Sequence, residues 1–357
     1  MNRSFLIILA ILAIFSLILH AIYVFGRLGV RDIPNERSLH TEITKKSGGM
    51  IFIPYFLLLF FLWGFLSQFG YLHSFPFPNE NFTFKLLIFG TIFFCLLGFA
   101  DDIFHLSPKL RLVLEFGFAF VWIYLVSPNI SLFGMEIHVT WLKVLFLGFV
   151  MVFVVNLVNF MDGLDLYLVG TTALSIYFWI PIFSLTLGFS NSYILILLLL
   201  LVSLSGFSFF NFPKAKLFMG DSGSLALGFL LFALPLILPR QNIGTFEISL
   251  LFFLFPVFWI DGIITLIIRA YQDKHVFSAH KEHLYQLLTE TKLGKTKTCL
   301  LVCLSNIPAY ISFSYFRIHQ SEFLFSEFVW VIMTVIIYMI IYILVRIGLH
   351  FSRKNLA

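Results

Sequence analysis

Long apolar runs separated by short polar segments are the dominant pattern along the chain. Eleven runs approach about 20 residues, the length that an α-helix needs to cross the hydrocarbon core of a bilayer. Their apolar residues are continuous rather than alternating, which favours helices over strands. The run centres lie near Ala13, Leu58, Phe93, Phe120, Val150, Ser175, Leu200, Leu230, Phe258, Ile307 and Val335. We therefore predict an all-α, polytopic integral membrane protein with about 11 transmembrane helices, forming a single domain over residues 1–357.

The composition supports this prediction. Hydrophobic residues make up 60% of the chain and charged residues 11%, and the mean hydropathy of +0.99 excludes an ordinary soluble domain. The net charge is +5, but the basic residues form no dense stripe interleaved with exposed aromatics. The expected partner is therefore the lipid bilayer, and a nucleic acid is not expected.

The basic residues also predict the orientation of the chain. If the N-terminus lies outside, 18 of the 23 Lys and Arg residues fall on the inner side of the membrane. Lys and Arg concentrate in cytoplasmic loops, so this arrangement is the preferred one. An odd number of spans then places the C-terminus in the cytoplasm.

The aspartates share that side. All eight fall at inner span ends or in inner loops: Asp32, Asp101, Asp102, Asp162, Asp165, Asp221, Asp261 and Asp273. A carboxylate at a span end is costly unless it has a ligand or a partner. Because Asp is a hard oxygen ligand suited to Mg²⁺, we expect an active site at the cytoplasmic face.

Two inner segments carry clustered polar groups. In "GFADDIFHLSPKLR", Asp101 and Asp102 are adjacent and repel each other, which calls for a proton, a metal ion or a nearby Lys109. In "NLVNFMDGLD", Asn156, Asn159 and Asp162 recur every three residues and are neighbours on a helix surface. Such a row suits a nucleotide or a metal ion, and the alternative is a polar clamp between helices.

Three further inner segments are weaker signals. "LFMGDSGS" brackets Asp221 with two glycines, which permit close approach of the backbone to a phosphate. The loop "RAYQDKHVFSAHKEHLYQLLTETKLGKTKT" carries His280, Lys281 and His283, and suits an anion better than zinc, although solvated histidines are the alternative. "RDIPNERSLHTEITKKSGG" reads by itself as an ordinary basic loop.

Taken together and in this order, "DIPNERSLH", "DD", "NFMDGLD", "FMGDSGS" and "AHKEHLYQLL" resemble the polyprenyl-phosphate N-acetylhexosamine-1-phosphate transferases of glycosyltransferase family 4. The resemblance covers about residues 32–286, and "AHKEHLYQ" is most similar to the branch that initiates O-antigen chains. It implies transfer of a sugar 1-phosphate from a UDP-N-acetylhexosamine to undecaprenyl phosphate, with release of UMP. The setting would be the bacterial inner membrane, and the resemblance also admits a homodimer.

The resemblance implies roles for individual residues. Asp101, Asp102 and His283 are the expected catalytic residues, and Asp221 with Asp162 would hold Mg²⁺, or Mn²⁺ as the alternative ion. One of the adjacent carboxylates would take the proton of the lipid phosphate or attack to form a covalent intermediate, and both routes stay open. The expected substrate-binding residues are Asn156, Asn159, Asp162, Asp165, Phe218, Lys109, His280, Lys281, Arg37 and His40.

Three other functions compete with this one. The phospho-MurNAc-pentapeptide transferase belongs to the same family, but it has consecutive histidines where this chain has "HLYQ". A transporter would place its carboxylates near the midplane on broken helices rather than at one face. A CDP-alcohol phosphotransferase would follow "DG" with Ala-Arg and further Asp, which "DGLDLYLVG" does not.

Overall fold

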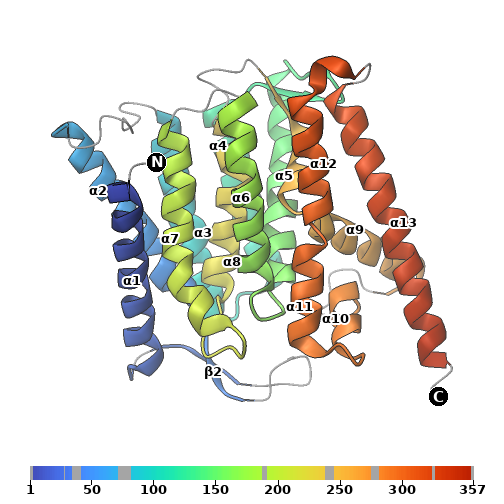
Figure 1. The fold of residues 1–357 in the computed structure, drawn as a ribbon, viewed down its shortest axis with the longest axis horizontal. Helices are drawn as coiled ribbons and strands as arrows, with labels where there is room; N and C mark the ends of the chain where they lie inside the picture. Colours follow the sequence, from blue (N-terminus) through green and yellow to red (C-terminus); the bar gives the residue numbers. More distant parts are fainter. Residues whose placement is uncertain are drawn as a thin grey trace.

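The computed structural model describes residues 3–27, 29–33, 42–70, 82–186, 191–237, 245–274, 281–323 and 326–354. Long helices run side by side through the molecule (Figure 1). The first half contains α1 (Arg3–Phe25), β1 (Arg31–Asp32), β2 (Thr44–Lys45), α2 (Gly49–Gln68), α3 (Phe82–Phe104), α4 (Pro108–Val126), β3 (Ile130–Leu132), β4 (Met135–Glu136), α5 (Thr140–Met161) and α6 (Tyr167–Thr186). The second half contains α7 (Asn191–Asn211), α8 (Asp221–Ile237), β5 (Phe246–Glu247), η2 (Ile248–Leu254), α9 (Pro256–Tyr271), α10 (Leu284–Thr289), α11 (Gly294–Leu304), α12 (Ile307–Ile318), η3 (Gln320–Glu322) and α13 (Glu327–Lys354).

The helices confirm an all-α polytopic membrane protein. All eleven predicted run centres lie in helices. Within the described ranges, seven helical segments are long and apolar enough to cross a membrane, with α11 and α12 acting as one, and an eighth is obtained if η2 and α9 count as one span bent by 101°. The predicted number of eleven is therefore not established. Helix α1 begins at one end of the bundle, and α13 ends at the opposite end (Figure 1). Termini at opposite ends are what an odd number of crossings requires.

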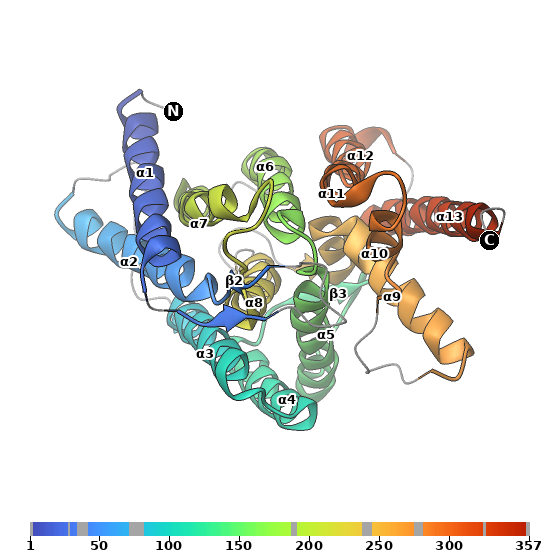
Figure 2. The same cartoon turned by 90° about the horizontal axis from the view of Figure 1, so that it is seen from below.

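Helix α8 forms the centre of the bundle. Seen from below, it is surrounded by α2, α3, α5, α6 and α7 (Figure 2). Every residue of α8 after Asp221 is buried, and its closest packing partners are α3 and α5. By contrast, α1 and α13 expose most of their apolar side chains, as helices that face lipid do.

Two glycines allow backbones to approach α8 closely at its N-terminal end. A Cβ atom on Gly98 of α3 would lie 2.1 Å from the backbone oxygen of Asp221, and one on Gly49 of α2 would lie 2.1 Å from the backbone nitrogen of Gly223. Any larger residue would push the helices apart, since small residues are what lets membrane helices meet. This contact places the end of α3 beside the start of α8.

Short strands close both ends of the bundle. At the end where α13 finishes, β1 and β2 pair antiparallel, and a bridge joins Lys45 to Leu217. The Phe218 amide donates to the Lys45 carbonyl at 2.7 Å, and the Gly48 amide donates to the Phe218 carbonyl at 3.0 Å. The other sheet has the order β4-β3-β5, with β3 and β5 parallel. The hydrogen bonds of Lys45 and Gly48 therefore hold residues 45–49 beside the segment that leads into α8.

Candidate active site

A cavity of about 410 Å³ opens at the end of the bundle where α8 begins. Its walls come from the end of α3, the α5–α6 turn, the segment before α8, and α10 and α11. It is lined by Asp32, Lys46, Asp102, Asn159, Phe160, Asp162, Gly163, Leu164, Asp165, Asn211, Phe218, Met219, Gly220, Asp221, Tyr285, Gln286 and Lys295. Segments far apart in the sequence thus supply one polar pocket.

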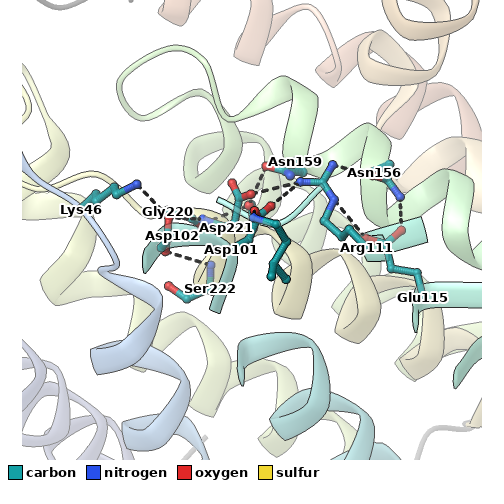
Figure 3. Close-up of polar contacts among 12 residues, drawn as sticks. Lys46, Asp101, Asp102, Arg111, Glu115, Asn156, Asn159, Gly220, Asp221 and Ser222 are labelled. Atoms are coloured by element: carbon teal, nitrogen blue, oxygen red, sulfur yellow. Dashed lines mark hydrogen bonds and ion pairs between the residues drawn. The ribbon is translucent and has the colours of Figure 1, made fainter. Parts of the chain in front are cut away.

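Asp102 lies on the floor of this cavity, one helical turn beyond Gly98. Its Oδ2 accepts from the Ser47 hydroxyl at 2.8 Å, and its Oδ1 accepts from the Asp221 amide at 3.2 Å. Lys46 Nζ lies 3.6 Å from Oδ1 (Figure 3). The close packing of α3 on α8 therefore joins two of the sequence motifs directly, with the carboxylate tied to the start of α8.

Arg111 of α4 joins the remaining carboxylates of these motifs. Its Nη1 lies 2.8 Å from Asp101 Oδ2 and 3.2 Å from Asp221 Oδ2, and its Nη2 donates to Asn156 Oδ1 at 3.2 Å (Figure 3). Hydrogen bonds between ionised groups are stronger than neutral ones. One guanidinium therefore supplies positive charge to two carboxylates that would otherwise repel each other.

Behind Arg111 lies a buried polar pair. Glu115, which has no exposed surface, lies 3.5 Å from Arg111 Nε and accepts from Asn156 Nδ2 at 2.5 Å. A buried carboxylate needs such partners, because an unpaired charge is expensive inside a protein. The contacts of Arg111 with Glu115 and Asn156 orient its guanidinium toward Asp101 and Asp221.

The predicted rim on α5 is present. The helix ends at Met161, so Asn159 lies in its last turn and Asp162 follows directly. The Ser224 hydroxyl donates to Asn159 Oδ1 at 3.1 Å. Burial, followed by the carboxylates of Asp221 and Asp102, raises the pKa of Asp162. Three carboxylates that line one cavity favour the binding of a cation there.

Hydrogen bonds fix the position of the segment before α8, which contributes to the lining of the cavity. Asp165 Oδ2 accepts from the Ala215 amide at 3.2 Å, and the Asn211 side chain bonds to the Leu166 amide and to the Leu217 carbonyl. Phe218, between these anchors and Asp221, lines the cavity. Backbone hydrogen bonds to Lys45 and Gly48 hold Phe218 at this position.

Helix α10 forms another wall and is anchored by Asp261 of α9. The buried Asp261 accepts from the Leu284 amide at 2.8 Å and the Tyr285 amide at 3.3 Å, and lies 3.5 Å from His283 Nδ1. Such contacts satisfy free amides at a helix N-terminus. His283 is itself buried, while Tyr285 and Gln286 line the cavity. His283, which was predicted to be catalytic, thus does not line the cavity and instead contacts Asp261.

The structure brings together six predicted site residues, which line the cavity: Asp102, Asn159, Asp162, Asp165, Phe218 and Asp221. Asp101 and Asn156 contact this group through Arg111. Lys109, Lys281 and His283 are described but do not line the cavity. Arg37, His40 and His280 lie outside the described residues.

Four charged residues that the sequence analysis did not single out also belong to the site. Lys46 and Lys295 line it, and Arg111 and Glu115 support the carboxylates from α4. The basic residues had a signal, because inner-loop Lys and Arg were noted, but in the sequence each reads as a topology determinant. Glu115 was not singled out from the sequence, although it is a charged residue in an apolar run.

The cavity has the donor chemistry for Mg²⁺. Asp221, whose side chain is 30% exposed, shares it with Asp102 and Asp162. Among the described residues, no group of three His, Cys, Asp or Glu side chains is arranged to hold a metal ion alone. Mg²⁺ commonly needs only one or two carboxylates together with water and substrate phosphates. The hard oxygen atoms therefore fit the ion, and its binding stays a prediction.

Comparison of the sequence with known proteins gives a matching family model and several similar proteins. Residues 84–239 match the model of glycosyl transferase family 4. The chain is 29% identical over 271 residues, 76% of each protein, to the undecaprenyl-phosphate alpha-N-acetylglucosaminyl 1-phosphate transferase of Thermotoga maritima. It is 26% identical over 294 residues to the probable undecaprenyl-phosphate N-acetylglucosaminyl 1-phosphate transferase of Bacillus subtilis, covering 78% of this chain and 75% of that protein. It is also 31% identical over 212 residues to the phospho-N-acetylmuramoyl-pentapeptide-transferase of Streptococcus pneumoniae, covering 56% of this chain and 60% of that protein.

Proposed function

We propose that this chain, which matches the model of glycosyl transferase family 4 over residues 84–239, transfers an N-acetylhexosamine 1-phosphate from a UDP-sugar to undecaprenyl phosphate, with release of UMP. One observation carries the proposal. Asp102, Asp162 and Asp221 meet in a single cavity with Phe218, at the end of a membrane bundle. A water-soluble nucleotide and a phosphate whose tail stays in lipid can meet there.

The proposed chemistry is phosphoryl transfer. An oxygen of the lipid phosphate attacks the sugar-side phosphorus of the UDP-sugar, and the bond from that phosphorus to the bridging oxygen breaks. The bond to the anomeric carbon is untouched, so the configuration of the sugar is retained. For this reaction class, catalysis consists mainly of positioning and neutralising charge.

The residues of the cavity divide these tasks. Phe218 stacks on the uracil ring, while Asn159 and Asp165 bond the nucleotide at the rim. Lys46 and Lys295 attract the phosphates, because both line the cavity that holds the carboxylates. Asp221 with Asp162 would hold Mg²⁺, which when bound screens the repulsion between the two anionic reactants.

Asp101 and Asp102 take different roles in this proposal. Asp102 lines the cavity and is the carboxylate that meets the lipid phosphate, receiving its proton. Asp101 is engaged by Arg111 at 2.8 Å and by the Leu106 amide at 2.8 Å. It therefore positions the guanidinium between α3 and α8 rather than contacting the substrate.

We further propose that the product initiates a cell-envelope polysaccharide of the O-antigen kind. The support is the similarity of "AHKEHLYQ" to the initiating branch. The alternative function is that of a phospho-MurNAc-pentapeptide transferase, because the chain is also similar to such a protein from Streptococcus pneumoniae.

The test uses purified full-length protein with undecaprenyl phosphate, Mg²⁺ and a UDP-sugar. Stoichiometric UMP and a lipid diphosphate sugar are expected with UDP-N-acetylglucosamine. Asp221→Asn should abolish the reaction, whereas Asp273→Asn, the same change on the same face outside the cavity, should not. Release of UDP in place of UMP would overturn the proposal, and turnover only with UDP-MurNAc-pentapeptide would select the alternative.

A further inference from the structure

A second cavity, of about 360 Å³, lies between α9, α10 and the inner end of α13. It shares no lining residue with the candidate active site. Ile268, Leu287 and Leu349 give it an apolar side, and Lys274, Glu282 and Arg346 give it a charged side. Figure 2 shows α10 against α9, with α13 alongside.

The charges of this cavity do not cancel. Glu282 is held by Lys274 at 2.6 Å and by Arg269 at 2.9 Å, and these hydrogen bonds lower its pKa and keep it ionised. Arg346 instead donates to the hydroxyl of Tyr342 at 2.6 Å and lies 3.4 Å from that of Thr265. Among the described residues, no carboxylate lies within ion-pairing distance of Arg346. The cavity therefore has an excess of positive charge.

The position of Arg346 in its helix indicates the kind of anion. The apolar span of α13 runs from Glu327 to Phe351, so Arg346 and Leu349 lie in its last two turns. Basic side chains at such a depth extend toward the headgroup layer, while the neighbouring apolar surface contacts acyl chains. A charged side next to an apolar side at this level matches an amphiphile with an anionic head.

We propose that this cavity binds an anionic phospholipid of the surrounding bilayer, with Arg346 as the residue that bonds the headgroup phosphate and Leu287 and Leu349 against the first part of the acyl chains. A guanidinium suits phosphate because it offers several donors in a fixed plane. The site is separate from the proposed reaction and does not depend on it.

A chain of hydrogen bonds connects this site with α10. Arg346 contacts the Tyr342 hydroxyl, which donates to Asp261 at 3.1 Å, and Asp261 in turn accepts from the Leu284 amide. Leu287 of α10 lines the lipid cavity, while Tyr285 of the same helix lines the candidate active site. Lipid bound at Arg346 therefore stabilises the wall that the two cavities share.

Lipid binding is measured by native mass spectrometry of the full-length protein released from nanodiscs of phosphatidylcholine with increasing phosphatidylglycerol. We expect one tightly retained phosphatidylglycerol in the wild type. Arg346→Gln should bind it at least about tenfold more weakly, since a charge-assisted bond to phosphate is lost. Arg346→Lys should keep most of the affinity. Lys297→Gln, which removes an exposed charge from α11 outside this cavity, is the matched control and should bind as the wild type does.

A second variant and a second measurement guard against a folding defect in Arg346→Gln. Leu349→Trp keeps every charge and fills the apolar side, so it should also lose the lipid. Hydrogen–deuterium exchange should show protection of residues 281–289 when phosphatidylglycerol is added, and none in Leu349→Trp.

Four results would overturn the proposal. They are equal retention by Arg346→Gln and the wild type, equal loss in Lys297→Gln, retention of phosphatidylcholine as tight as that of phosphatidylglycerol, and binding of inorganic phosphate alone with the same affinity. Retention of undecaprenyl phosphate but not of phosphatidylglycerol would also overturn it, because the cavity would then belong to the substrate path.

Discussion

Replacing Arg111 by Gln tests whether this guanidinium compensates the clustered carboxylates. Arg111 is 2.8 Å from Asp101, 3.2 Å from Asp221 and 3.5 Å from Glu115. Gln keeps a hydrogen-bonding side chain but removes the charge. The variant then leaves three carboxylates without their shared cation, and Glu115 has no access to solvent.

The size of the effect follows from burial. Removing one partner of a buried ion pair costs about 3–5 kcal/mol, and the lower end applies here because the Arg111 side chain keeps 16% of its surface exposed. For a chain of this length, we expect a loss of roughly 3 kcal/mol to lower the melting temperature by about 4 °C. Adding Glu115→Gln removes the most deeply buried charge, so the double variant should recover about half of the loss.

Thermal unfolding in detergent, followed by intrinsic fluorescence, measures these shifts. Lys109→Gln removes an exposed charge from the same helix and is the control, with an expected change of at most about 1 °C. A melting temperature for Arg111→Gln within about 1 °C of the wild type would refute charge compensation. So would a double variant no more stable than Arg111→Gln alone.

Three further predictions concern activity and topology. Asp221→Asn should abolish turnover while the protein still inserts, and chelation of Mg²⁺ should abolish wild-type turnover reversibly; near-normal activity of the variant at limiting Mg²⁺ would contradict the assignment. Gly98→Leu should lower kcat by at least about 100-fold, because a Cβ at this position would lie 2.1 Å from the Asp221 backbone and would displace the carboxylates. Gly117→Leu, which has open space around it, is the control and should leave kcat unchanged. A topology reporter fused after Asn355 should be active only in the cytoplasm, and periplasmic activity would reverse the predicted orientation.

The sequence predicted the cavity well where its residues form contiguous motifs. Asp101 with Asp102, Asn159 with Asp162, and Asp221 each stood out because a short, polar side chain at the end of an apolar run is costly. Their common inner position also implied that they would meet. No distance was predictable, because it depends on the close packing that Gly98 permits.

The supporting residues were harder to foresee. Arg111 pairs with Asp221 across 110 positions, and no spacing rule connects such residues. Asp261 was noted only as one of the eight inner aspartates, and its role in anchoring α10 depends on a fold in which α9 bends by 101° away from η2. The same bend and the 17-residue length of α8 are two reasons why the predicted number of eleven spans is not established by the helices that are long and apolar enough to cross a membrane.

The length of α8 has a consequence for where the two substrates meet. Its 17 residues extend about 26 Å at 1.5 Å per residue, some 4 Å less than a hydrocarbon core of about 30 Å. A helix in contact with lipid would have to thin the membrane or tilt to match, but α8 is enclosed by protein and has no such constraint. The cavity lined by Gly220 and Asp221 lies at the N-terminal end of this helix. In the proposed reaction, the nucleotide would enter this cavity to reach the lipid phosphate, and the polyprenyl chain would not have to leave the bilayer.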